Sequence, residues 1–421
     1  MEGKNRWLIA IMGTLLMVVL GSIYSWSFFQ KPIVEQFKWS NSQVAWVFST
    51  SITFLGLAAA WGGINLPKYG PRKLAILGSI MWGLSFVIGG YALSIHNLPL
   101  LIIGIGVIGG IGLGLGYVTP VVTAAKWFPD KKGFVTGMVV MGFGFGALAM
   151  SKILAPAVLS ITDNSLVVSF YYIGVIMLVL GFCSAIFIVP PPADYVPAGY
   201  TPPAAPVSTG KTIPITAKSA VMSGKFILMW LVFFINIIAG IMLIGFQSPM
   251  MQDIYAKYDP GKDVAALAAI GATLIAITSI FNGVGRFFWG SLSDKIGRVQ
   301  AFRLILLTQI IVFGLLMFIS NPYIFGALFC IVLLCYGGGF GTMPAFVGDV
   351  FGPVLMPVVY GIILTAWSAG GIVGPQIAAI MKDTFPESAS LYSFIAAGGL
   401  LIIGLIITFF LNNEPLAEKE A

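Results

Sequence analysis

One arginine stands in a stretch that offers it no nearby charge. Residues 280–298 read IFNGVGRFFWGSLSDKIGR, and the next charge after Arg286 is Asp294. A guanidinium is planar, stays charged, and can give two parallel hydrogen bonds to one carboxylate. This residue type in an apolar setting favours a binding site for a small carboxylate. The alternative is an arginine that reaches backbone carbonyls or the membrane surface.

Two polar residues share the helical face of Arg286. Asn282 precedes it by one turn and Thr278 by two turns, so the three side chains lie on one side of a helix. Asn282 could contact a ligand held by Arg286, or it could hydrogen-bond a neighbouring helix. This face is the first candidate for a polar site.

The composition places this stretch in a membrane. Of 421 residues, 58% are hydrophobic and only 9% charged, far too few charges for the surface of a soluble protein of this size. The three cysteines lie in apolar runs and the single histidine, His96, in a short loop. We therefore expect no disulfide framework, no metal and no other cofactor. The apolar runs also hold no catalytic constellation, so an enzyme is the least expected class.

Twelve apolar runs are long enough to cross a bilayer, which takes about 20 residues. The first run is too long for a signal peptide, so we interpret it as a transmembrane helix. The runs begin near Trp7, Val44, Leu74, Pro99, Gly133, Leu166, Phe226, Val264, Arg303, Tyr323, Val359 and Leu391. Residues 190–225 open with PPPADYVPAGYTPPAAP, typical of an extended linker. The sequence predicts an all-α membrane protein with six helices in residues 1–189, a cytoplasmic linker, and six helices and a short tail in residues 226–421.

The basic residues predict the orientation. If both termini and the linker face the cytoplasm, 15 of the 22 Lys and Arg residues fall on that side and six on the other. The positive-inside rule predicts this bias. We therefore expect a multi-pass protein of the cell membrane with both termini cytoplasmic, and we attribute the basic turns to topology, not to nucleic-acid binding. Lys152 is among the six outer residues, which leaves Arg286 as the only charge expected well inside the membrane.

Two turns repeat at an offset of 227 residues, GINLPKYGPRK at 63–73 and GSLSDKIGRVQ at 290–300. A repeat of six spans is expected of a secondary transporter. The second turn resembles the signature loop of the major facilitator superfamily, while the first has Pro67 where that family has an acid. The resemblance implies two pseudo-symmetric six-helix bundles and a conformational-switch role for both loops. The residues concerned are Gly290, Asp294, Lys295, Gly297 and Arg298, and in the first copy Gly63, Gly70 and Arg72.

A narrower resemblance comes from two further stretches. KWFPDKKGFVTGMVVMGFGFG (126–146) and FNGVGRFFWGSLSDKIGR (281–298) resemble the monocarboxylate porters and the oxalate–formate exchangers, above all the bacterial lactate-type transporters. In that group an arginine of the eighth span binds the substrate carboxylate, which implies this role for Arg286. Asn282 stands where animal monocarboxylate transporters carry an acid implicated in proton handling. Trp367 aligns where the oxalate exchangers carry a second cation, which implies a substrate with one carboxylate.

Aromatic residues could complete a cavity around the arginine. In this superfamily spans 1, 4, 7 and 10 surround the transport path, and tyrosine hydroxyls and rings suit a short carboxylic acid. Plain helix packing is the alternative for each of them, and for Trp367. The candidates are Tyr24, Phe28, Tyr117 and Tyr336.

These observations predict transport of a small monocarboxylate such as L-lactate, together with a proton, by a monomer in a bacterial inner membrane. Because Asn282 cannot titrate, proton coupling would run through the substrate itself, through an acid at the rim, or not at all. Anion exchange of the oxalate–formate type is the main rival. From another class, a membrane sensor that binds a carboxylate without moving it is also open.

Overall fold

The structure is a computed structural model that describes residues 5–130, 132–192, 195–197 and 216–416. Within these residues every regular element is helical, and twelve helical segments are long and apolar enough to cross a membrane. The prediction of an all-α membrane protein with twelve transmembrane helices is confirmed. Most of the predicted linker and residues 417–421 of the tail lie outside the described residues.

The first six spans are built from α1 (Arg6–Gly21), η1 (Ser22–Ser25), α2 (Trp26–Phe37), α3 (Asn41–Tyr69), α4 (Pro71–Ser94), α5 (Leu98–Leu101), η2 (Ile102–Gly109), α6 (Gly110–Trp127), α7 (Lys132–Ala149), η3 (Met150–Leu154), α8 (Ala155–Ile161) and α9 (Leu166–Ala185). After the short α10 (Ala217–Met222) follow α11 (Gly224–Tyr258), α12 (Val264–Ile296), α13 (Arg298–Leu316), α14 (Pro322–Ile363), α15 (Thr365–Thr384), η4 (Pro386–Ser388), α16 (Ala389–Ile407) and η5 (Thr408–Phe410). The helix α14 turns sharply at Gly352, where span 10 ends.

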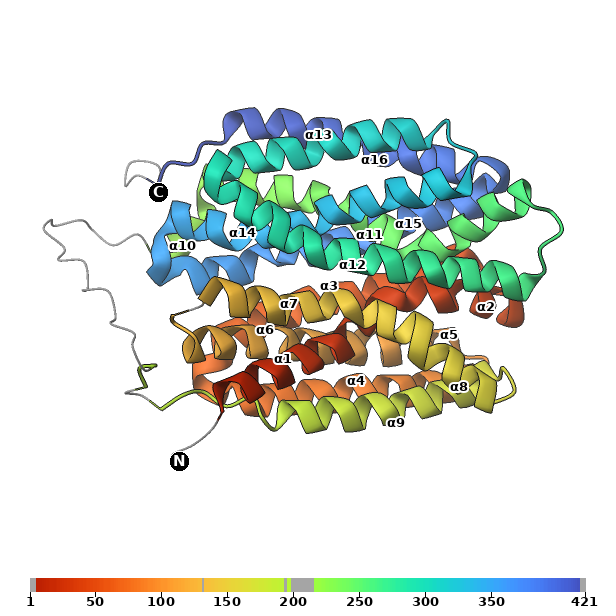
Figure 1. The fold of residues 1–421 in the computed structure, drawn as a ribbon, viewed down its shortest axis with the longest axis horizontal. Coiled ribbons are helices and arrows are strands. Elements are labelled where there is room, and N and C mark those ends of the chain that lie inside the picture. Colours follow the sequence, from red (N-terminus) through yellow and green to blue (C-terminus); the bar gives the residue numbers. More distant parts are fainter. Residues whose placement is uncertain (1–4, 131, 193–194, 198–215, 417–421) are drawn as a thin grey trace, which may run out of the picture.

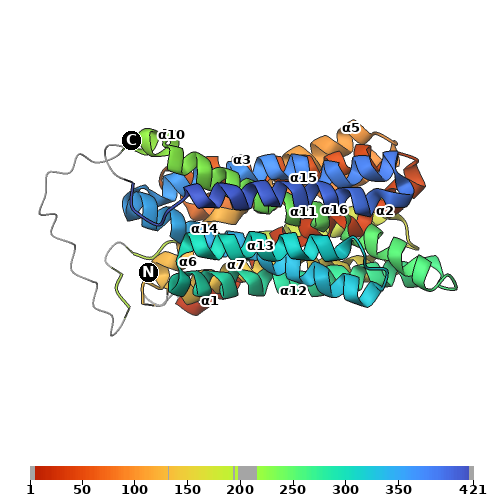
Figure 2. The same ribbon diagram turned by 90° about the horizontal axis from the view of Figure 1, so that it is seen from above.

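The helices form two six-helix bundles, as predicted. In Figure 1, α1 to α9 lie together in the lower part and α11 to α16 in the upper part, and Figure 2 gives the same molecule from above. Helix α1 begins at the same end of the molecule as α9 ends and α10 begins. We call this the terminal end, and we call the opposite end, with the connections 38–40, 259–263 and 385–388, the far end.

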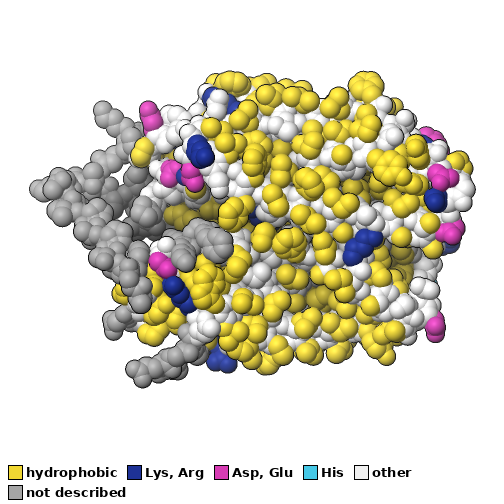
Figure 3. All heavy atoms as spheres, viewed as in Figure 1, with side chains coloured by type: hydrophobic (Ala, Val, Ile, Leu, Met, Phe, Trp, Pro, Cys, Tyr) yellow, Lys and Arg dark blue, Asp and Glu magenta, His cyan; other side chains and the backbone are white. Residues whose placement is uncertain are grey.

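The surface matches a membrane environment. Hydrophobic side chains cover the band between the two ends, and charged side chains gather mainly at the ends (Figure 3). Large apolar residues within the spans, such as Ile153, Val175 and Ile311, are exposed, because lipid takes the place of water there. The chain is a multi-pass membrane protein.

Lys152 is a correction to the predicted charge map. It lies in η3, nine residues before the end of the span Gly137–Ile161, and not in an outer loop. The reason is that helix α8 continues well beyond the apolar run that began near Gly133. Arg286 is therefore not the only charge inside a span.

Two glycines make the repeated turns much shorter than expected. Helix α3 continues through Gly63 to Tyr69, so Gly70 alone separates it from α4, with φ 76° and ψ 153°. Gly297 separates α12 from α13 with φ 90° and ψ 151°. A positive φ of this kind favours glycine. The two junctions share one backbone conformation, which is a structural counterpart of the sequence repeat.

The described end of the linker also differs from the expected extended chain. Helix α10 forms there because the hydroxyl of Thr216 accepts a hydrogen bond from the N–H of Ser219 and caps the first turn.

Candidate functional site

Arg286 lies in the second half of α12, ten residues before its end, and α12 packs against α14 and, across the two bundles, against α7. Its side chain is buried, with a residue exposure of 6%. Helix α14 comes very close to it because of two glycines: a Cβ added at Gly341 would lie 2.1 Å from the carbonyl oxygen of Arg286, and one at Gly337 2.1 Å from that of Asn282. Backbone contact between α12 and α14 thus fixes the arginine's position.

Aromatic rings approach the guanidinium, and part of its hydrogen-bonding edge is unpaired. Its Cζ lies 5.2 Å from the ring centre of Phe340 and 6.0 Å from that of Phe143. Nη1 donates to the hydroxyl of Tyr117 at 3.4 Å. Nε and Nη2 are buried and have no hydrogen-bond partner among the described residues. Two adjacent N–H donors are therefore left for a ligand.

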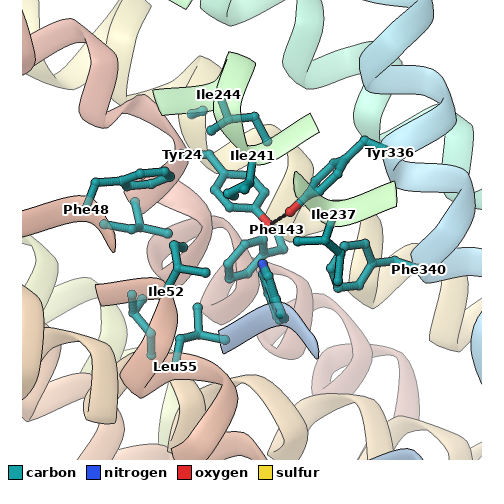
Figure 4. Packing of buried hydrophobic residues seen from close by; sticks show 14 of the residues in the cluster. Tyr24, Phe48, Ile52, Leu55, Phe143, Ile237, Ile241, Ile244, Tyr336 and Phe340 are labelled. Atoms are coloured by element: carbon teal, nitrogen blue, oxygen red, sulfur yellow. Dashed lines mark hydrogen bonds between the residues drawn. The ribbon is translucent and has the colours of Figure 1, made fainter. Parts of the chain in front are cut away.

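Three more aromatic residues extend this cluster. The ring centre of Trp367 lies 4.8 Å from that of Phe340 and 5.5 Å from that of Tyr117. The hydroxyls of Tyr24 and Tyr336 lie 2.7 Å apart and join span 1 to span 10 across the two bundles. Figure 4 shows these two tyrosines pointing toward one another, with apolar side chains around them: Phe48, Ile52, Leu55, Phe143, Ile237, Ile241, Ile244 and Phe340.

The structure brings most of the predicted residues together, but not Phe28. That side chain is half-buried and packs its ring against Phe29 at 5.1 Å. Residue 28 follows Tyr24 by one turn, yet the 3₁₀ segment η1 at Ser22–Ser25 changes the helical register between them. The residues in the cluster are Arg286, Tyr117, Trp367, Tyr24 and Tyr336.

Asn282 and Thr278 are buried on the face of Arg286, as their spacing predicts. Thr278 donates to the side-chain oxygen of Gln247 on α11 at 2.6 Å. The side-chain oxygen of Asn282 is buried and has no partner among the described residues. The interhelical hydrogen bond considered for Asn282 is thus not made by that oxygen.

Phe143 and Phe340 belong to the cluster but were not predicted. Both stand between glycines, in GFGFG (142–146) and GGGFG (337–341). Their position between glycines, which is typical of closely packed helices, is the sequence feature that could have identified them. Ring type alone does not reveal which way a side chain faces.

The second signature loop is an ion-pair cluster at the terminal end. Arg298 lies 2.6 Å from a carboxylate oxygen of Asp294 and donates through Nε to Asp349 at 2.8 Å. Gly290 lies in contact with α14, where an added Cβ would lie 3.4 Å from the carbonyl oxygen of Gly341. Lys295 is exposed in the last turn of α12. In the first loop, Arg72 is exposed in the first turn of α4 and Gly63 lies inside α3.

A buried cation with free donors has a clear chemical consequence. Keeping an arginine inside a membrane protein is costly unless it is solvated or paired. Cation–π contacts offset part of that cost. Among the described residues, Arg286 is the one Lys or Arg side chain in contact with this aromatic cluster. The arrangement suits one anionic group that accepts two hydrogen bonds.

The fold and this site define a transporter of two helical bundles. The sequence profile of the Major Facilitator Superfamily matches residues 7–375 and 268–421, and the chain belongs to this superfamily. It is 26% identical over 391 residues to the oxalate:formate antiporter of Oxalobacter formigenes, covering 90% of this chain and 86% of that protein. It is 28% identical over 386 residues to apicoplast pyruvate carrier 1 of Toxoplasma gondii, covering 79% and 68%.

Solved structures agree on the fold. A bacterial homologue of the human lysosomal transporter Spinster, in an inward-facing and unoccupied conformation, superposes with a TM-score of 0.73 at 17% identity, covering 97% of both chains. The resemblance to the major facilitator fold is thereby confirmed.

Proposed function

We propose that the protein is a secondary transporter that carries a small monocarboxylate such as L-lactate, together with a proton, by alternating access of the two bundles. The observation that carries this proposal is the buried guanidinium of Arg286, whose Nε and Nη2 lack partners. A carboxylate placed against that edge would accept two parallel hydrogen bonds. Tyr117 already accepts from Nη1, so the donors left unpaired match one carboxylate.

A single carboxylate fits the surroundings better than two. With one cation in the cluster, a dianion would leave a buried charge uncompensated. Trp367 stands where the oxalate exchangers carry a second cation, and its ring is part of the apolar wall. Aromatic walls suit a carbon chain of a few atoms. A relative that carries pyruvate supports the same substrate class.

We also propose how transport is coupled to protons and in which membrane the protein lies. Asn282 cannot titrate, so the proton moves with the substrate or on an acid at the rim. The charge bias supports a bacterial inner membrane with the terminal end in the cytoplasm. We assign conformational control to both loops, residues 63–73 and 290–300, and action to a monomer made of the bundles 1–189 and 226–421 joined by the linker 190–225.

Anion exchange is the second candidate, favoured by the similarity to the oxalate:formate antiporter. An exchanger needs an anion on the opposite side of the membrane, whereas a proton symporter responds to a pH gradient. One uptake experiment can therefore distinguish exchange from proton symport.

Uptake of radiolabelled L-lactate into proteoliposomes tests the proposal. With an inward proton gradient we expect accumulation that Arg286→Ala abolishes. Arg303→Ala is the matched control, because this arginine bonds Thr408 and Gln300, away from the cluster, and should keep uptake near wild type. Uptake that does not depend on the proton gradient but requires an anion inside the proteoliposomes would instead establish exchange. If lactate binds but does not accumulate, the protein would instead be a membrane sensor that does not transport.

A further inference from the structure

The N-terminus of α3 is only partly capped by its own bundle. Ser40 and Gln43 form a capping box, in which the Ser40 hydroxyl accepts from the N–H of Gln43 and the Gln43 side chain accepts from the N–H of Ser40. The N–H groups of Asn41 and Ser42, at the first two helical positions, are not satisfied by this box. Every helix has such free donors in its first turn.

Asp383, from the other bundle, accepts hydrogen bonds from both of these donors. One carboxylate oxygen accepts from the backbone N–H of Asn41 at 3.0 Å and from its side-chain amide at 3.1 Å. The other accepts from the backbone N–H of Ser42 at 2.8 Å and from its hydroxyl at 2.5 Å. The carboxylate also faces the positive end of the helix dipole of α3. Span 11 thus completes the cap of span 2 at the far end.

Two lysines of the first bundle also form polar contacts with the second bundle. Lys152 of η3 donates to the hydroxyl of Thr273 at 2.5 Å and to the carbonyl oxygen of Ala269 at 3.3 Å, both on α12. Lys31 of α2 donates to Gln252 of α11 at 3.1 Å. These contacts also lie in the halves of the spans nearer the far end.

The described ion pairs near the terminal end have a different character. Arg6 pairs with Asp130 at 2.8 Å within the first bundle, and Arg298 pairs with Asp349 at 2.8 Å within the second. These pairs stabilise each bundle separately. Among the described residues, the polar contacts that join the bundles to each other are therefore concentrated toward the far end.

We propose that Asp383 is a gating residue, which holds the far end closed by capping α3 across the bundles and releases it when that end opens. The cap exists only while the bundles are in contact at the far end. When that end opens, water becomes the hydrogen-bond partner of the four donors of Asn41 and Ser42. Asp383 is exposed, and water can replace protein donors at modest cost. The contact is therefore strong enough to favour the closed state and weak enough to break in each cycle. This assignment does not depend on the substrate.

Distances between spin labels at the far end test the proposal without substrate. Nitroxides are placed at Gln36→Cys and Glu387→Cys, one exposed position in each bundle, in protein reconstituted into liposomes. The native Cys183, Cys330 and Cys335 are replaced by alanine. Wild type should give mainly a short distance. Asp383→Ala should raise the ratio of long to short distances roughly tenfold, because charge-assisted hydrogen bonds are lost.

Asp263 supplies the matched control. It also caps a helix at the far end, accepting from the N–H of Ala266 at 2.7 Å, but within its own bundle. Asp263→Ala should leave the distance distribution as in wild type. Asp383→Asn keeps one acceptor oxygen and should give an intermediate ratio, which also serves if the alanine variant does not fold. An unchanged distribution in folded Asp383 variants, or an equal shift in Asp263→Ala, would overturn the proposal.

Discussion

At the scale of the residue, the environment of Arg286 combines nearby rings with an unpaired hydrogen-bonding edge. Phe340 and Phe143 lie within cation–π distance of the guanidinium, and Tyr117 occupies Nη1. An acidic partner would neutralise the cation and compete with a carboxylate for Nε and Nη2. Aromatic rings stabilise the charge without using those donors. The proposed carboxylate site gains from this division, because an anion could bind and leave without displacing an acidic side chain.

Tyr117→Phe tests the fixed end of this arrangement. Without the hydroxyl, Nη1 loses its partner and the guanidinium can rotate, so its open edge is less well oriented. We expect the KM for L-lactate uptake to rise about fivefold, as the loss of one hydrogen bond allows, with little change in maximal rate. Proteoliposome kinetics give both quantities.

Tyr392→Phe is a suitable control for this substitution, because Tyr392 is exposed on α16 and packs against Phe385. An unchanged KM in Tyr117→Phe would mean that the contact at 3.4 Å does not orient the arginine.

At the scale of the element, α12 and α14 are held at backbone contact by glycine. An added Cβ at Gly285 would lie 2.0 Å from the carbonyl oxygen of Leu334, and Gly341 faces Arg286 in the same way. The glycine-rich run 337–341 therefore positions the arginine, although it contributes no polar side chain to the site.

Gly341→Ala should separate the two helices. The new methyl group cannot fit 2.1 Å from a carbonyl oxygen, so either helix must shift. We expect destabilisation of about 1–3 kcal/mol and a strong loss of uptake. Thermal unfolding of the purified protein, followed by intrinsic fluorescence, measures the first effect.

Gly314→Ala on α13 is the matched control, because nothing lies within 4 Å of its added Cβ. It should leave the melting temperature unchanged or slightly raised, since alanine favours a helix. Equal behaviour of the two variants would contradict the packing role of Gly341.

The twelve helices were predictable because apolar runs of bilayer length follow from the solvent, whereas their ends were not. Helix α3 continues through Gly63 and Pro67 to Tyr69, and span 5 extends past Lys152 to Ile161. Those boundaries depend on helix packing and on the single glycine junctions, which composition does not reveal.

At the scale of the whole molecule, the two bundles meet through layers of different chemistry. Tyr24 and Tyr336 join them at the aromatic cluster, and Asp383 and Lys152 join them nearer the far end. Arg286 was predictable because it is a rare charge in an apolar run. Asp383 was not, because its importance arises only when span 11 lies beside the start of span 2.

Direct binding tests the central claim that Arg286 is the carboxylate receptor. Isothermal titration of L-lactate into purified protein should give saturable binding in the wild type and at least a hundredfold weaker binding in Arg286→Ala, because two charge-assisted hydrogen bonds are lost. Arg303→Ala should bind as the wild type does. Wild-type affinity in a folded Arg286→Ala protein would contradict the claim.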